Sequence, residues 1–307
     1  MGRHSGRSPR ELPVAAAQVG HATMSTETSF ALPTGQTLAI QSESTAKASS
    51  EALARASEEM RKAGPDLGGW TVRSGTGCRL WHTLDATRSD CALSRQGGKV
   101  WDSAEVLSLL LVEWGEQLVA GRRVLELGCG CGLVGLVAAA LGPAEVVLTD
   151  QVLFMAQANL DANYPSGPER DRTSVRRLVW GEEADVVAVG SPFDLIVGSD
   201  IIYHGEDHLT LAETLAALSG EGTTVLFVTP DGSGGGAALG APFFFECRRL
   251  GFDVEDVTQE EAVARAIRAV DPLNGEDFNP FSFTRGPMAC LRMTMRRAGS
   301  KRGDARL

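Results

Sequence analysis

The amino-acid sequence predicts an α/β protein built on a doubly wound parallel sheet. From residue 101 onward, short apolar segments typical of buried strands alternate with longer segments of helical apolar periodicity. A glycine-rich turn follows the first of these strands and opens a helix, where such sheets bind their ligands. With 307 residues, of which 43% are hydrophobic and 22% charged, the chain can bury a sizeable core.

The N-terminal third gives weaker signals than the rest of the chain. We expect residues 1–28 to be disordered, since Ser, Ala, Gly and Arg are frequent and apolar periodicity is absent. Residues 30–41 predict a short hairpin with Gly35 at its turn. Residues 45–62 predict a solvent-exposed helix, and one or two edge strands are expected within residues 70–93.

From residue 101 onward, the predicted helices and strands alternate regularly. Asp102 or Ser103 is expected to cap a first helix that extends to about Leu118. Seven strands are predicted, at residues 123–127, 145–149, 175–179, 194–198, 223–229, 253–257 and 288–295. Five further helices are predicted, at residues 133–141, 152–163, 207–219, 242–250 and 260–270.

The net charge of −10 is unevenly distributed. Between Gly98 and Cys290 there are 12 Lys and Arg against 29 Asp and Glu, so the body of the protein is acidic. An acidic body repels phosphate backbones, and we expect no nucleic-acid partner. It would attract a cationic partner, although an acidic surface that only maintains solubility explains the charge equally well.

Cysteine usage and apolar run lengths indicate the compartment. Six irregularly spaced cysteines do not form a disulfide framework and favour a reducing environment. The longest apolar run, residues 136–141, is far shorter than the roughly 20 residues that span a bilayer, so no membrane association is expected. We predict a cytoplasmic or nuclear protein; an organellar transit peptide and a translation start at Met24 remain alternatives.

The most informative segment is Val124-Leu-Glu-Leu-Gly-Cys-Gly-Cys-Gly-Leu-Val-Gly135. Its glycines fit the dinucleotide fingerprint, and Asp150 follows where a ribose-binding acid is expected. Glu126 argues against that reading, because a carboxylate at the strand end repels a pyrophosphate and stabilises an amino group. This Glu-x-Gly-x-Gly-x-Gly pattern resembles the cofactor loop of the class I, seven-strand S-adenosylmethionine methyltransferases.

Three further segments narrow the resemblance to the lysine-methylating branch, methyltransferase family 16. They are Trp101-Asp-Ser-Ala before the first helix, Leu178-Val-Trp-Gly181 after the third strand, and Asp200-Ile-Ile-Tyr203 after the fourth. The hairpin at residues 30–41 resembles that of the family more loosely. The resemblance implies a Rossmann-like sheet of order 3-2-1-4-5-7-6 with an antiparallel last strand, and S-adenosyl-L-methionine as cofactor.

The resemblance also implies roles for individual residues. Asp200 and Tyr203 would be catalytic, orienting a lysine amine; Asp200 as a plain helix-capping acid is the alternative. Cofactor-binding residues would be Trp101, Glu126, Gly128, Cys129, Gly130, Gly132, Asp150, Gln151, Trp180 and Ser199. For Trp101 and Trp180, ordinary core packing is the alternative. His204 and His208 have a spacing that suits a metal, but we interpret them as part of a polar helix start and expect no metal.

The sequence therefore predicts a protein-lysine N-methyltransferase. We divide the chain into a disordered segment (1–28), a hairpin with an insertion (29–97), a methyltransferase domain (98–297) and a basic tail (298–307). The expected partner is a protein with an exposed lysine, and we expect a monomer. A methyltransferase acting on a small molecule or another side chain, an NAD(P)-dependent oxidoreductase and a catalytically silent binding module are the alternatives. Residues 258–287 depart from the family pattern.

Overall fold

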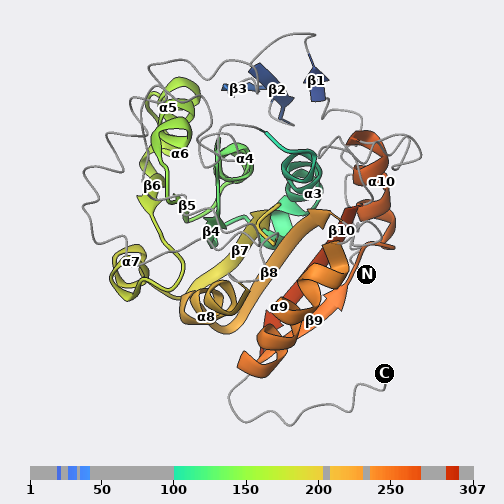
Figure 1. Ribbon diagram of the computed structural model, residues 1–307. Coiled ribbons are helices and arrows are strands. Elements are labelled where there is room, and N and C mark those ends of the chain that lie inside the picture. The colour runs from blue at the N-terminus through green and yellow to red at the C-terminus, as the bar shows by residue number, and fades with distance from the viewer. Residues whose placement is uncertain are drawn as a thin grey trace, which may run out of the picture.

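The computed structural model describes residues 19–21, 27–32, 35–41, 100–202, 208–230, 236–270 and 288–296 (Figure 1). The predictions for residues 45–62 and 70–93 lie outside these residues. None of the described helices is both long and apolar enough to cross a membrane.

A seven-stranded sheet forms the centre of the molecule, in the order β6-β5-β4-β7-β8-β10-β9. Neighbours from β6 to β8 pair in parallel, and β10 pairs antiparallel with both β8 and β9. The predicted order 3-2-1-4-5-7-6 and the antiparallel last strand are therefore confirmed. The strands are β4 (Arg123–Leu127), β5 (Glu145–Asp150), β6 (Thr173–Arg177), β7 (Phe193–Ser199), β8 (Ser219–Pro230), β9 (Phe252–Asp256) and β10 (Met288–Met295).

Helices cover both faces of this sheet, so the domain has three layers (Figure 1). On one face lie α3 (Asp102–Leu118), α4 (Leu133–Ala140), α5 (Phe154–Asn163), the short α6 (Pro168–Asp171) and α10 (Glu261–Val270). On the other face lie α7 (Glu183–Val189), α8 (His208–Leu218) and α9 (Gly236–Leu250). This arrangement is the doubly wound architecture that the sequence predicts.

Successive residues of a strand point to opposite faces of the sheet, so alternate residues of the central strands belong to two separate cores. In β7, Leu195 and Val197 belong to the core under α3 and α4, and Ile196 to the core under α8 and α9. In β4, Val124 faces the first core, while Leu125 and Leu127 face the second. This alternation places Glu126, two residues after Val124, on the α4 face of the sheet.

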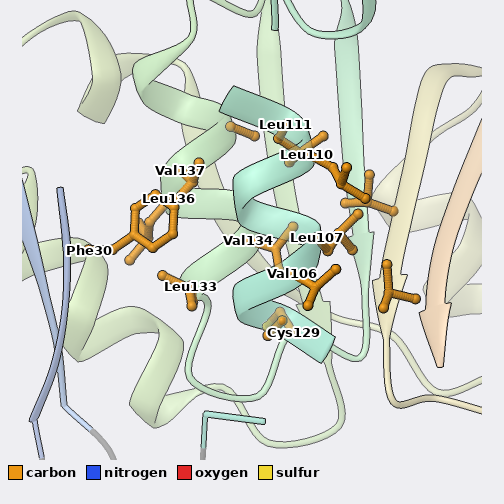
Figure 2. Packing of buried hydrophobic residues seen from close by; sticks show 14 of the residues in the cluster. Phe30, Val106, Leu107, Leu110, Leu111, Cys129, Leu133, Val134, Leu136 and Val137 are labelled. Carbon is orange, nitrogen blue, oxygen red and sulfur yellow. The ribbon is translucent and has the colours of Figure 1, made fainter. Parts of the chain in front are cut away.

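The N-terminal strands β1 (Val19–His21), β2 (Glu27–Ala31) and β3 (Thr37–Gln41) form a second, antiparallel sheet. Gly35, with φ of +86°, lies in the turn between β2 and β3, so the predicted hairpin is confirmed. Its large apolar side chains, Phe30, Leu32, Leu38 and Ile40, are fully or almost fully buried and share one core with α3 and α4. Figure 2 shows Phe30 beside Leu136 and Val137 of α4. Val19–His21, within the segment predicted to be disordered, pairs antiparallel with β2.

Most predicted elements occur with small differences in their bounds. The first helix begins one or two residues earlier than expected, because Trp101 rather than Asp102 or Ser103 occupies the N-cap, without a side-chain hydrogen bond. Asp102 lies in the first turn, where its negative charge is favourable. Strand β6 begins at Thr173 rather than at 175, because Thr173 pairs with Val146 of β5. Helices α6 and α7 were not predicted, since four and seven residues are too short for periodicity to show.

Candidate functional site

The candidate site lies where β4, β5 and β7 end side by side. Leu127 of β4 pairs with Thr149 of β5 and with Gly198 of β7, so the residues that follow these three leave the sheet at one level. The order of the strands reverses at β4, which is where open α/β sheets bind their ligands. The glycine loop (residues 128–132), Asp150 and the Asp200 turn (residues 199–202) therefore share one edge.

The glycine loop needs residues without a side chain at two of its positions in particular. Gly128 has φ of +63°, and an added Cβ would lie 2.6 Å from Cγ2 of Ile201. Gly132, with φ of +83°, is the N-cap of α4, and a Cβ there would lie 2.8 Å from Leu148. Both positions combine a left-handed backbone with close packing, so the loop is compact and its backbone can approach a ligand.

Glu126 lies beneath this loop rather than above it. Its side chain is 2% exposed, and its Oε2 accepts a hydrogen bond of 2.8 Å from the backbone N–H of Gly135 in the first turn of α4. A Cβ on Gly135 would lie 2.6 Å from that same oxygen, so the glycine is what admits the carboxyl group. Burial raises the pKa of Glu126 to about 8, which the Gly135 hydrogen bond opposes and the nearby Asp150 reinforces.

Asp150 ends β5 and holds the loop from the other side. Its Oδ2 accepts the N–H of Gly130 at 2.9 Å, and its Oδ1 accepts the N–H groups of Gln151 at 2.7 Å and Val152 at 3.2 Å. Burial raises the pKa of Asp150, against the lowering effect of these three hydrogen bonds. A carboxylate has about four acceptor positions, so room remains for one more donor, such as a hydroxyl group.

The Asp200 turn brings a second acid to the same edge. Asp200 has φ of +54°, a conformation that residues with a side chain rarely adopt, and its N–H donates to the carbonyl of Val228 at 3.1 Å. The turn directs the next residue, Ile201, back into the core, where it is only 6% exposed. Added Cβ atoms at Gly128 and at Gly198 would each lie 2.6 Å from Ile201, so its side chain fills the space above both glycines.

The segment around Trp180 closes the site on the β6 side. The Trp180 side chain is half-buried against the core under α8, and a Cβ on Gly128 would lie 3.9 Å from its ring. The N–H of Gly181 donates to Oγ1 of Thr214 at 2.8 Å, which ties this segment to α8. The structure therefore gathers Trp180, Gly128 and Ile201, of which Trp180 and Gly128 were predicted as site residues.

The remaining predicted site residues differ in how far they are buried. Trp101 is half-buried, and its carbonyl accepts the N–H of Ala104 at 2.9 Å at the start of α3. Ser199 is also half-buried, whereas Gln151 is exposed. Cys129 and Cys131 are buried in the glycine loop, and burial raises the pKa of the Cys129 thiol, as expected for a small neutral loop residue. Tyr203 and His204 lie outside the described residues.

Sequence reasoning missed two residues of this arrangement. In the sequence, Ile201 is only an apolar position within Asp200-x-x-Tyr203, and its contact with Gly128 depends on the unusual φ of Asp200, for which no sequence signal exists. Thr214 carries its hydroxyl toward the Trp180 segment from a helix whose sequence shows only apolar periodicity. Within the part of the chain that the structure describes, no three His, Cys, Asp or Glu side chains gather as a metal site.

These residues fit S-adenosylmethionine, the cofactor that the sequence resemblance implies. The compact glycine loop exposes backbone to a ligand, Asp150 can accept a hydroxyl hydrogen bond at the end of β5, and a buried acid lies under the loop. The sheet order with its antiparallel last strand is that of the seven-strand S-adenosylmethionine-dependent methyltransferases. The fold and the site therefore agree with the class of protein that the sequence resembles.

Comparison with known protein families gives the same resemblance. Residues 84–231 match the family model described as lysine methyltransferase, so the resemblance read from the sequence is confirmed. Among curated relatives, protein N-lysine methyltransferase METTL21A of Danio rerio is 45% identical over 129 residues, which cover 41% of this chain and 57% of the relative. METTL21A of Mus musculus is 40% identical over 147 residues, 47% of this chain and 65% of the relative.

The name of a fungal relative includes a second methyl acceptor besides lysine, the protein N-terminus. Protein N-terminal and lysine N-methyltransferase EFM7 of Cryptococcus neoformans is 33% identical over 129 residues, 39% of this chain and 42% of the relative. The chain therefore spans between two fifths and two thirds of the length of these three relatives.

Proposed function

We propose that this protein is an S-adenosylmethionine-dependent protein-lysine N-methyltransferase. The observation that carries the proposal is the direct packing of the Asp200 turn on the glycine loop, through Ile201 and Gly128, within the segment that matches the lysine methyltransferase family. This packing brings an acid suited to an amine next to a loop suited to the cofactor. The names of the METTL21A relatives support a protein-lysine acceptor.

The reaction is the transfer of a methyl group from a sulfonium to an amine. S-adenosylmethionine, held by the glycine loop and Asp150, would supply an electrophilic methyl group: the carbon–nitrogen bond would form with the lone pair of the amine as the carbon–sulfur bond breaks and sulfur keeps the electron pair. The amine must therefore be deprotonated before transfer, although a free lysine has a pKa of about 10.4. The task of the chain is to align the amine and to accept its hydrogen bonds.

We assign these tasks to Asp200 and Tyr203. The Asp200 carboxylate accepts hydrogen bonds from the lysine amine and so orients its lone pair, and the fixed backbone of the turn restricts where the carboxylate can point. Tyr203 supplies an aromatic wall and a hydroxyl hydrogen bond for the same amine, with cation–π attraction while the amine is still protonated.

Cofactor binding is assigned to the glycine loop and the two acids around it. Asp150 accepts a hydrogen bond from a ribose hydroxyl, for which it has a free acceptor position. Glu126, protonated in large part at neutral pH because its pKa is about 8, regains its charge when a cationic amino group approaches. Trp101, Trp180, Gln151 and Ser199 complete the proposed set.

The partner, the assembly and the compartment remain predictions. We propose a protein substrate that carries an exposed lysine, for which the acidic composition between residues 98 and 290 provides a complementary charge. A monomer in the cytoplasm or nucleus, without a nucleic-acid partner, completes the proposal.

Two measurements test the proposal. S-adenosylhomocysteine at about 100 times its dissociation constant stabilises a folded protein by roughly 2.7 kcal/mol, so the melting temperature should rise by about 5–10 °C, whereas NAD and NADP should have no effect. With methyl-labelled S-adenosylmethionine and a cell lysate, the label should appear on lysine side chains of proteins.

The possible outcomes separate the alternatives. A stabilisation by NAD alone would favour an oxidoreductase, and label in the small-molecule pool would favour a different methyl acceptor. Label on protein N-termini, an acceptor that the name of the EFM7 relative includes, would contradict the lysine assignment. A protein that binds S-adenosylhomocysteine and labels nothing would be a silent binding module.

A further inference from the structure

Helix α5 lies directly behind the glycine loop. Its residues Ala156, Asn159, Leu160 and Asn163 follow each other at intervals of three, one and three, so they share one face of the helix. Ala156 is fully buried, and a Cβ on Gly132 of the loop would lie 3.3 Å from its Cβ. The side chain of Ala156 therefore supports the end of the loop.

Asn159 adds a polar contact to this support. The side chain is fully buried, and its Nδ2 donates a hydrogen bond of 2.8 Å to the carbonyl oxygen of Cys131 in the glycine loop. That carbonyl belongs to the peptide group that joins Cys131 to Gly132, the residue with φ of +83° at the start of α4. The Asn159 amide thus fixes the orientation of the peptide group where the loop turns into the helix.

Asn163, one turn further along α5, connects the same face to the N-terminal hairpin. Its Oδ1 accepts the N–H of Ala39 at 2.8 Å, and its Nδ2 donates to the carbonyl of Ala39 at 2.9 Å. The same Nδ2 also donates to the backbone carbonyl of Asn159 at 2.8 Å. A continuous series of hydrogen bonds therefore runs from strand β3 through α5 to the glycine loop.

We propose that Asn159 is a positioning residue for the cofactor, and that Asn163 extends this constraint to the hairpin. The hairpin would then contribute to cofactor affinity without being part of the loop. This inference rests on the proposed function, since it takes S-adenosylmethionine as the ligand of the loop. Its physical basis is that removing the Asn159 donor removes a hydrogen bond that fixes the orientation of this peptide group.

Two variants test the inference with S-adenosylhomocysteine as the probe. Asn159→Leu keeps the approximate volume of the side chain and removes the donor, so the dissociation constant measured by calorimetry should rise about tenfold. Asn163→Ala separates α5 from Ala39 but leaves the Asn159–Cys131 hydrogen bond in place, and the dissociation constant should rise about threefold. In a transfer assay, KM for S-adenosylmethionine should rise in both variants while kcat at saturating cofactor is retained.

Two control variants on α5 separate positioning from stability. Leu160→Ala, on the same face, should lower the melting temperature without changing the dissociation constant, because Leu160 packs in the core. Gln157→Ala removes only an exposed hydrogen bond to Asp161 and should change neither quantity. These controls show whether a loss of affinity follows from the loop or from general destabilisation.

The results separate this inference from the proposed function. If the unaltered protein does not bind S-adenosylhomocysteine, the proposed function fails and the inference with it. If the unaltered protein binds and Asn159→Leu binds equally well, only the inference is overturned. If Asn159→Leu does not fold, Asn163→Ala decides: an unchanged dissociation constant overturns the inference and a raised one supports it.

Discussion

The glycine loop and the Asp200 turn lie at the same edge of the sheet and use the same unusual backbone conformation by different means. Gly128, Gly130 and Gly132 reach positive φ without steric cost, whereas Asp200 reaches +54° with a side chain. Asp150, which accepts the Gly130 N–H, and Asn159, which donates to the Cys131 carbonyl, hold the loop, while the burial of Ile201 anchors the turn.

This difference indicates a division of tasks. A loop made of glycines presents backbone and suits a ligand that must approach closely. A residue held at positive φ costs on the order of 1–3 kcal/mol and persists where its surroundings impose it, often at functional sites. Asp200 is thus expected to serve the reacting amine, and the loop to hold the cofactor. Variants that affect one function and spare the other test this division.

The largest effect is expected for Asp200→Ala. Without the carboxylate, the amine loses its alignment, and methyl transfer to protein should fall by at least about 100-fold. Affinity for S-adenosylhomocysteine should stay within a few-fold of the unaltered protein, because the glycine loop is intact. Transfer of labelled methyl groups and calorimetry on the same preparation measure the two quantities.

A matched control uses an acid at the opposite end of the same strand. Asp194 accepts a hydrogen bond from the N–H of Arg123 at 2.8 Å, far from the carboxyl edge, and Asp194→Ala should retain transfer. Full transfer by Asp200→Ala would remove the main support for the lysine assignment and for the division between loop and turn.

The next effect in size is expected for Asp150→Ala. The variant removes the acceptor of the Gly130 N–H and the proposed charge-assisted hydrogen bond to a ribose hydroxyl, which would be worth roughly 1.5–3 kcal/mol. Affinity for S-adenosylhomocysteine should therefore fall about 10- to 100-fold. Asp161→Ala, which removes an exposed acid of α5, serves as the control in the same titration. Equal affinity of both variants would show that Asp150 does not bind the ribose.

The smallest effect concerns pH and Glu126. Its pKa is about 8 in the folded protein against an ordinary value of 4.5, so between these values the folded state holds a proton that the unfolded state has released. The free energy of unfolding therefore falls as the pH rises from 4.5 to about 8, by at most about 1.4 kcal/mol per pH unit. The stabilisation by the Glu126 proton is fully present below pH 4.5 and is lost as the pH rises through about 8.

Glu126→Gln removes this titration and keeps an oxygen that can accept the Gly135 N–H. Urea unfolding at pH 5, 6, 7 and 8 should therefore give a shallower decline for the variant than for the unaltered protein. Glu116→Gln, at an exposed position of α3, should follow the unaltered protein. Parallel curves for all three proteins would contradict the raised pKa.

The sequence predicts elements whose signal is local. Strand β4 has the predicted bounds because Arg123–Leu127 is a short apolar segment that ends at glycines, and β10 has the predicted bounds as well. The direction of Glu126, on the α4 face of the sheet, also follows from the two-residue period of β4. By contrast, the Ile201 contact follows from one backbone angle, and the Asn163–Ala39 pairing joins residues 124 positions apart. Neither leaves a local pattern.

The docking of the hairpin on α4 bears on how the protein can be shortened. The family match begins at residue 84 and the predicted methyltransferase domain at residue 98, so both boundaries omit Phe30, Leu32, Leu38 and Ile40. All four lie in the core that contains Leu136 and Val137 of α4, and their removal would uncover an apolar surface there. Exposed apolar patches promote aggregation. A truncated protein should therefore keep the chain from at least Glu27 if it is to remain monodisperse during purification.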